Sequence, residues 1–174
     1  RKIDTLIIDK TGTLTEGRPA FDRAVAAPGF TESEVLRLAA SLDQGSEHPL
    51  ADAIVQAARE RGLTLDKPDE FESGSGIGVR GIVAGRTLLL GNTTLMLQQN
   101  VSIDVLLPQA EALRTEGASV MHLAVDGKLA GLLAVFLGAG YWVFRANTKP
   151  GPEQGDPSAM VDSTRTAQHV GSAT

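Results

Sequence analysis

The apolar residues of this chain follow helical spacing in its first half. Thr31-Glu32-Ser33-Glu34 has the spacing of a capping box, and apolar residues then recur at helical intervals, which predicts a helix running to about Leu42. A second helix is predicted from Pro49, whose fixed φ suits a first turn, to a stop at Gly62. Two helices therefore follow each other closely.

After Pro68 the apolar period changes from helical to alternating. Short strands are predicted around Phe71, over 79–83 and over 86–90, and helices over 92–99 and 108–116. The last strands, 119–125 and 128–133, flank Asp126-Gly127, the pair most favoured in a two-residue type I′ hairpin. This order predicts an α+β fold, an antiparallel sheet with helices packed on it.

The start of the chain has a different organisation. The apolar run 5–8 reads as a short buried strand, and the polar, glycine-containing stretch 9–17 reads as a loop, so Asp9 lies at a strand tip. Such an aspartate can attack a phosphoryl group while loop hydroxyls and backbone N–H groups bind the phosphate oxygens. An ordinary polar turn is the alternative. Residues 19–29, bracketed by proline and glycine, read as an extended connector.

Composition narrows the possible functions. The formal net charge is -5 and the 16 basic residues are scattered, which makes nucleic acid a poor partner. The absence of cysteine excludes disulfides and thiolate metal sites, and three histidines are too few for a histidine metal cage. His122, on a predicted strand, is expected to face solvent or to make a structural hydrogen bond.

The end of the chain is atypical. Residues 129–144 contain no charged side chain, but this run is just shorter than the roughly 17 to 25 residues that span a bilayer, so membrane contact is marginal. The hairpin prediction uses the first half of the run. Beyond residue 146 the sequence is rich in Pro, Gly, Ser, Thr and Gln, and disorder is expected.

The string Asp9-Lys10-Thr11-Gly12-Thr13-Leu14-Thr15 resembles the phosphorylation motif of P-type ATPases. These pumps carry a haloacid-dehalogenase-like phosphorylation domain with a nucleotide-binding domain inserted into it. Dehalogenase-type phosphatases usually have a second aspartate, a general acid and base, where this chain has Thr11. A threonine cannot do this work, so the resemblance favours a pump with a lasting aspartyl phosphate over a phosphatase.

Two further strings are similar to those of the heavy-metal (P1B) subfamily. Ser46-Glu47-His48-Pro49-Leu50-Ala51 is similar to its SEHPL signature, and Gly74-Ser75-Gly76-Ile77-Gly78 to its glycine motif. The stretch 116–131 looks like the end of the same domain. The resemblance covers roughly residues 1–135 and implies a partial phosphorylation domain at 1–18, a nucleotide-binding domain at 30–133 and an atypical tail at 134–174.

The resemblance also implies roles for individual residues in an ATP site. His48 would stack beside adenine, Glu47 would support the pocket, and Gly74 and Gly76 would let the backbone approach the nucleotide. Asn92 matches a further pocket position, and Asp43 stands where the family commonly has a glutamate that reads adenine. As alternatives, His48 and Asn92 could be simple helix caps.

For the phosphorylation site, the resemblance implies that Asp9 is the phosphate acceptor, assisted by Lys10, Thr11 and Thr13, with Mg²⁺ at Asp9 and Thr11. The family's downstream Thr-Gly-Asp and Gly-Asp-Gly-x-Asn-Asp strings are absent, so the magnesium site is incomplete and we expect ATP binding with little or no turnover.

The implied parent is a membrane pump whose ATP-binding part lies at the cytoplasmic face of a bacterial inner membrane and which transports a heavy-metal cation, with a family-level lean to copper or silver. A degenerate or regulatory nucleotide-binding protein and a dehalogenase-type phosphatase are the alternatives. Residues 76–81 also satisfy GxGxxG, but the residues that follow alternate like a strand rather than forming the required helix, which argues against a dinucleotide fold.

Overall fold

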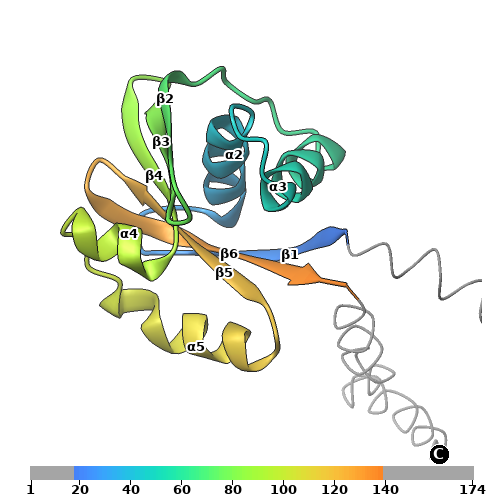
Figure 1. Cartoon of the computed structure of the whole chain (residues 1–174), viewed down its shortest axis with the longest axis vertical. Coiled ribbons are helices and arrows are strands. Elements are labelled where there is room, and N and C mark those ends of the chain that lie inside the picture. The colour runs from blue at the N-terminus through green and yellow to red at the C-terminus, as the bar shows by residue number, and fades with distance from the viewer. Residues whose placement is uncertain (1–17, 139–174) are drawn as a thin grey trace, which may run out of the picture.

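A computed structural model describes residues 18–138, which form a six-stranded antiparallel sheet covered by helices on both faces (Figure 1). The strands lie in the order β1-β6-β5-β4-β3-β2. Their bounds are β1 Pro19–Ala26, β2 Asp69–Gly74, β3 Gly78–Val83, β4 Arg86–Gly91, β5 Ser119–Val125 and β6 Lys128–Leu137. The helices are α2 Glu32–Asp43, α3 Pro49–Glu60, α4 Thr93–Gln98 and α5 Leu107–Thr115, with a 3₁₀ turn at Asp104–Leu106. The predicted α+β class is confirmed.

Each face of the sheet has its own apolar core. Helices α2 and α3 cover one face, where Leu38, Leu42 and Ile54 are fully buried against strand residues such as Leu90. Helices α4 and α5 cover the other face, where Met96 and Leu113 pack with residues of β4, β5 and β6. Figure 1 shows the two helix pairs separated by the sheet. The sheet is therefore a middle layer, buried on both sides.

Local sequence signals account for several element boundaries. The Thr31 hydroxyl accepts a hydrogen bond from the Glu34 amide at 3.2 Å, and the Glu34 carboxylate accepts one from the Thr31 amide at 2.9 Å. This is the predicted capping box. Asp126 and Gly127 have φ of 49° and 81°, as a type I′ turn requires, and they join β5 to β6.

The predicted connector at 19–29 is wrong over Pro19–Ala26, which is strand β1 at one edge of the sheet. β1 is extended, as expected, but it pairs antiparallel with β6. Ala24 is buried, and Phe21 packs on the core beneath α2 and α3. Proline is tolerated at the first residue of an edge strand, so the flanking Pro19 did not exclude this element.

The charge-free run beginning at Leu129 forms strand β6, which extends past the predicted end at 133 to Leu137. Every residue from Leu129 to Phe136 is buried because β6 lies between β1 and β5 and under helices on both faces. The expectation of membrane contact is therefore wrong for residues 129–136. Within residues 18–138, no helix is long and apolar enough to cross a bilayer. Residues 139–144 lie outside the described residues, as does the tail expected to be disordered.

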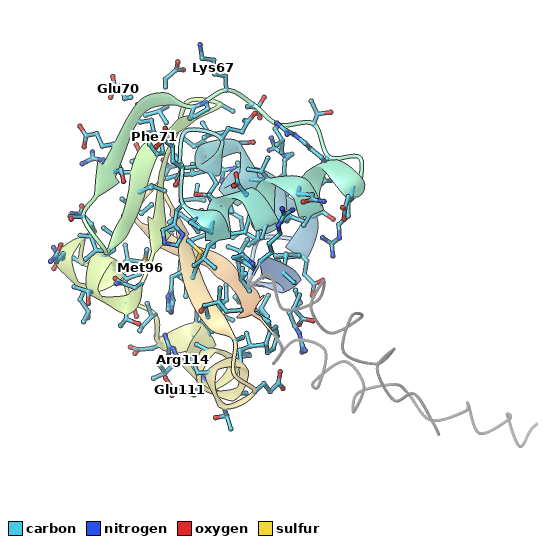
Figure 2. All side chains as sticks on the ribbon, turned by 45° about the vertical axis from the view of Figure 1, so that its right-hand side comes forward. Lys67, Glu70, Phe71, Met96, Glu111 and Arg114 are labelled. Atoms are coloured by element: carbon cyan, nitrogen blue, oxygen red, sulfur yellow. The ribbon has the colours of Figure 1, made fainter. Side chains whose placement is uncertain are left out.

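Side chains in and just before β2 show which side of this strand faces the core. In Figure 2, Phe71 of β2 points toward the helices while Lys67 and Glu70 point outward. Phe71 packs on the core that contains α2.

His122 of β5 is 1% exposed, so the expectation that it faces solvent is wrong. Burial lowers the pKa of His122, and the nearby positive charge of Arg114 on α5 lowers it further.

A close backbone approach lies between β3 and β4, where Gly78 pairs with Gly91. A Cβ at Gly91 would lie 2.2 Å from the Ile77 carbonyl oxygen and 2.8 Å from the Gly78 Cα. A Cβ at Gly78 would lie 2.3 Å from the Leu90 carbonyl oxygen. Only glycine fits at both positions. This contact holds the 74–78 loop against the start of α4.

We expect Gly91→Ala to lower the free energy of unfolding by about 1–3 kcal/mol, because the new methyl group collides with backbone atoms that cannot rotate away. Urea denaturation of the full chain measures this loss. Gly85→Ala, at the opposite end of the same hairpin, is the comparison for a methyl group that meets nothing within 4 Å. The φ of +76° at Gly85 alone makes alanine cost about 1 kcal/mol there, so the loss in Gly91→Ala should exceed that amount. A loss of unfolding free energy in Gly91→Ala no larger than that in Gly85→Ala would contradict the importance of the close Gly78–Gly91 contact for the fold.

Candidate functional site

A cavity of about 330 Å³ opens where four segments that are distant in sequence come together. The segments are the end of α2 with the start of α3, the β2–β3 loop, the end of β4 with the residue after it, and the start of β5. Its size falls in the range typical of small-molecule sites. Six of its lining residues set its chemistry: Asp43, His48, Gly76, Ile77, Asn92 and Met121.

His48 is both a helix cap and a wall of this cavity. Its Nδ1 accepts a hydrogen bond from the Leu50 amide at 3.1 Å, which makes it the N-cap of α3, and Pro49 occupies the first turn as expected. Because Nδ1 accepts, the neutral ring carries its proton on Nε2. The cap fixes the ring position, while the side chain stays exposed and faces the cavity. The capping alternative and the pocket position are thus both observed.

Asn92 is likewise both a helix N-cap and a lining residue of the cavity. Its Oδ1 accepts a hydrogen bond from the Leu95 amide at 3.0 Å as the N-cap of α4, and its Nδ2 donates to the Gly76 carbonyl at 3.3 Å. Its backbone N–H also donates to the Ile77 carbonyl at 3.0 Å. Asn92 therefore ties α4 to the glycine loop that forms one side of the cavity.

The two predicted site glycines, Gly74 and Gly76, are required for different local reasons. Gly76 has a φ of +74°, a conformation that other residues adopt at a cost, and a Cβ there would meet nothing within 4 Å. At Gly74 a Cβ would lie 3.0 Å from the Ile77 side chain, so this glycine lets the loop fold closely on itself. Both line the cavity.

Asp43 is a buried acid at the end of α2. It is 3% exposed, and its Oδ2 has no hydrogen-bond partner among the described residues. Burial raises the pKa of Asp43 from its usual 3.8 to about 7, and the negative charge of Asp52 on α3 contributes to this rise. A carboxyl group in such a position is at its most stable when it carries its proton.

One predicted site residue within 18–138, Glu47, is not brought to this cavity. Glu47 is exposed and does not line it. Asp9, Lys10, Thr11 and Thr13 lie outside the described residues, so their phosphate and Mg²⁺ roles stay predictions. Over residues 18–138 no group of three or more His, Asp or Glu side chains is placed to hold a metal ion.

Sequence reasoning missed much of the cavity's apolar lining. Ile77, Val79, Leu90 and Met121 all line it and also pack on the protein core. Ile77 lies inside the glycine motif 74–78, and Gly91 is the chain neighbour of the predicted residue Asn92. Both lining residues could therefore have been predicted from the sequence strings already identified. Residues of β5 line the cavity because of the strand order in the sheet, and no local sequence pattern predicts that order.

Comparison with known proteins adds the family. The model of a haloacid dehalogenase-like hydrolase matches residues 3–147. Over 134 residues the chain is 49% identical to a copper-exporting P-type ATPase of Legionella pneumophila and 42% identical to a silver exporting P-type ATPase of Salmonella typhimurium. These alignments cover 77% of this chain but only 18% and 16% of the two relatives.

Solved structures agree. The crystal structure of a zinc-transporting PIB-type ATPase superposes with a TM-score of 0.65 at 30% identity, covering 74% of this chain and 20% of that one. The N-domain of a copper-transporting P-type ATPase superposes with a TM-score of 0.58 at 28% identity, covering 68% of this chain and 98% of the N-domain. The chain spans less than a fifth of the curated relatives named above. It belongs to the haloacid dehalogenase-like hydrolases, and its sequence and fold resemble those of the heavy-metal P-type ATPases.

Proposed function

We propose that this chain is the ATP-binding portion of a P-type ATPase that transports a heavy-metal cation, copper or a similar ion, at the cytoplasmic face of a bacterial inner membrane. The observation that carries the proposal is the cavity itself, in which Asp43, His48, Gly74, Gly76 and Asn92 come together although they span 50 positions of sequence. The names of the relatives support the kind of pump and its cargo.

The cavity offers complementary surfaces to a purine nucleoside. Ile77, Val79 and Leu90 supply apolar contact for a flat base, and the His48 ring supplies an aromatic surface for stacking. Polar groups at the rim, Ser46 and Ser75 among them, suit the ribose hydroxyls. Binding would then depend chiefly on the base and the sugar.

The phosphates would leave the cavity toward Asp9. In the intact pump, a carboxylate oxygen of Asp9 would form a bond to the γ-phosphorus, the bond from that phosphorus to the β,γ-bridging oxygen would break, and ADP would depart with the electron pair. For this chain alone we expect ATP binding with little or no turnover. Lys10, Thr11 and Thr13 would orient the γ-phosphate. Mg²⁺, when bound at Asp9 and Thr11, would neutralise charge on the phosphate oxygens. The described residues provide no metal cluster for this step.

The proposal gives His48 a test that separates capping from binding. We expect His48→Asn to keep α3 intact, because asparagine is among the best N-caps, while the loss of the ring weakens ATP binding about tenfold. Isothermal titration calorimetry measures the affinity and thermal unfolding measures the cap. His48→Ala, which removes both, is the control variant. Unchanged ATP affinity in His48→Asn would remove the stacking role.

The lining suggests a second test. Among the described residues that form the cavity there is no lysine or arginine. We therefore expect ATP, ADP and AMP to bind within about threefold of one another, and a large increase in NaCl concentration to change the affinity by less than about threefold, since no ion pair is screened there. Inorganic triphosphate should not compete. Strong competition by triphosphate would instead indicate that the phosphates determine binding.

A further inference from the structure

The start of strand β5 is a part of the cavity lining that no predicted motif accounts for. Ser119, Val120 and Met121 all line the cavity. Met121 packs on the core that contains α2 and α3, and side chains two positions apart in a strand lie on the same face, so the Ser119 side chain lies on that face as well. Met121 and Ser119 therefore continue the floor of the cavity along β5.

This floor leads from a closed end of the cavity to an open end. Leu90 is fully buried and Val79 is nearly so, whereas Met121 and Ser119 are partly exposed. The closed end is apolar and suits a flat base. Phosphates are costly to bury without a cation, and no lysine or arginine is among the described residues that line the cavity. The phosphates of a bound nucleotide therefore belong at the open end.

The strand order distinguishes two ways out of the cavity, one past Ser119 on β5 and one past Ser73 on β2, which also lines it. The segment with Asp9 directly precedes β1, and β1 is one edge of the sheet. Strand β5 is two strand spacings from β1, or about 10 Å across the sheet. Strand β2 is the opposite edge, five spacings or about 24 Å away. The way past Ser119 is the shorter one to the segment with Asp9.

The register of the strands agrees with their order. Ser119 pairs with Val135 of β6, and Pro19, the first residue of β1, pairs with Leu137 of β6. The start of β5 is thus offset from the start of β1 by only two residues, or about 7 Å, along the strands. A path along the cavity floor past Ser119 points toward the residue at which the chain enters the sheet.

We propose that the phosphates of the bound nucleotide leave the cavity over the start of β5, and that the Ser119 hydroxyl donates a hydrogen bond to the α-phosphate. Met121 then lies under the sugar, and a neutral donor at the rim orients the phosphate chain without an ion pair. The inference rests on the proposed function and deepens it, because it assigns a direction to the nucleotide and a residue that contacts its phosphates.

The first test is a matched pair of variants at Ser119. Threonine keeps the hydroxyl, valine replaces it with a methyl group of similar size, and both β-branched residues suit a strand. Calorimetric titration of the full chain with AMP should give an affinity about fivefold lower in Ser119→Val than in Ser119→Thr. Adenosine, which lacks the phosphate, should bind both variants equally. Equal AMP affinities in the two variants, or an equal loss with adenosine, would overturn the hydrogen bond.

Lysine on either side of the cavity tests the direction of the phosphates independently. In Ser119→Lys an ammonium group lies beside the phosphates, so the ratio of ATP to AMP affinity should rise about fivefold at about 0.15 M NaCl and return to its original value at about 1 M NaCl. Ser73→Lys is the matched control, because it places the same charge on the β2 side of the cavity. Its ATP-to-AMP ratio should stay within about twofold of the original. Equal rises in both variants, a rise only in Ser73→Lys, or a rise in neither would overturn the proposed path.

The same titrations separate a failure of the inference from a failure of the proposed function. If AMP and ATP bind the original chain but the Ser119 variants give the overturning results, the nucleotide site remains and only the path assigned to its phosphates is wrong. If neither nucleotide binds the original chain, the proposed function fails and this inference fails with it.

Discussion

The structure depends most on the close backbone contact between Gly78 and Gly91. At this point β3 and β4 approach so closely that a Cβ on either residue would lie within 2.3 Å of a carbonyl oxygen. The contact places the Gly76 carbonyl within reach of the Asn92 amide group, and Asn92 in turn begins α4. A loop that would otherwise be free at one end of the hairpin is therefore held on both sides, which is how a glycine-rich segment can form a defined cavity wall.

Two side chains of the site act both as helix caps and as cavity lining, which explains why capping and binding were difficult to tell apart from the sequence. His48 and Asn92 are N-caps whose side chains also line the cavity. A capping side chain has its rotamer fixed by a backbone N–H at 3.1 Å or less, so the group that it presents to a ligand is already oriented. A cap is thus a reason to expect a preorganised site and does not argue against one.

The sequence predicted the features that depend on neighbours in the chain and missed those that depend on distant strands. The capping box at Thr31 and the turn at Asp126-Gly127 require residues within four positions, and both are present as expected. Strand β1 was missed because its pairing partner lies more than 100 residues away. The β6 run was misinterpreted in part because a strand buried on both faces loses its alternation and reads as a continuous apolar segment. In the cavity, motif residues were found and Met121, which depends on strand order, was not.

The positions of β1 and β6 also bear on how this domain could be connected to another one. β1 and β6 are adjacent and antiparallel, and Pro19 pairs with Leu137, so the chain enters and leaves the described domain at the same point of the sheet (Figure 1). A domain with this geometry can be inserted into a loop of another domain without separating the two ends of that loop. The segment with Asp9 precedes β1 directly in sequence. The apolar residues of β6 complete the sheet beside β1 at this entry and exit point, so the hydrophobicity of residues 129–136 is explained by packing within the domain.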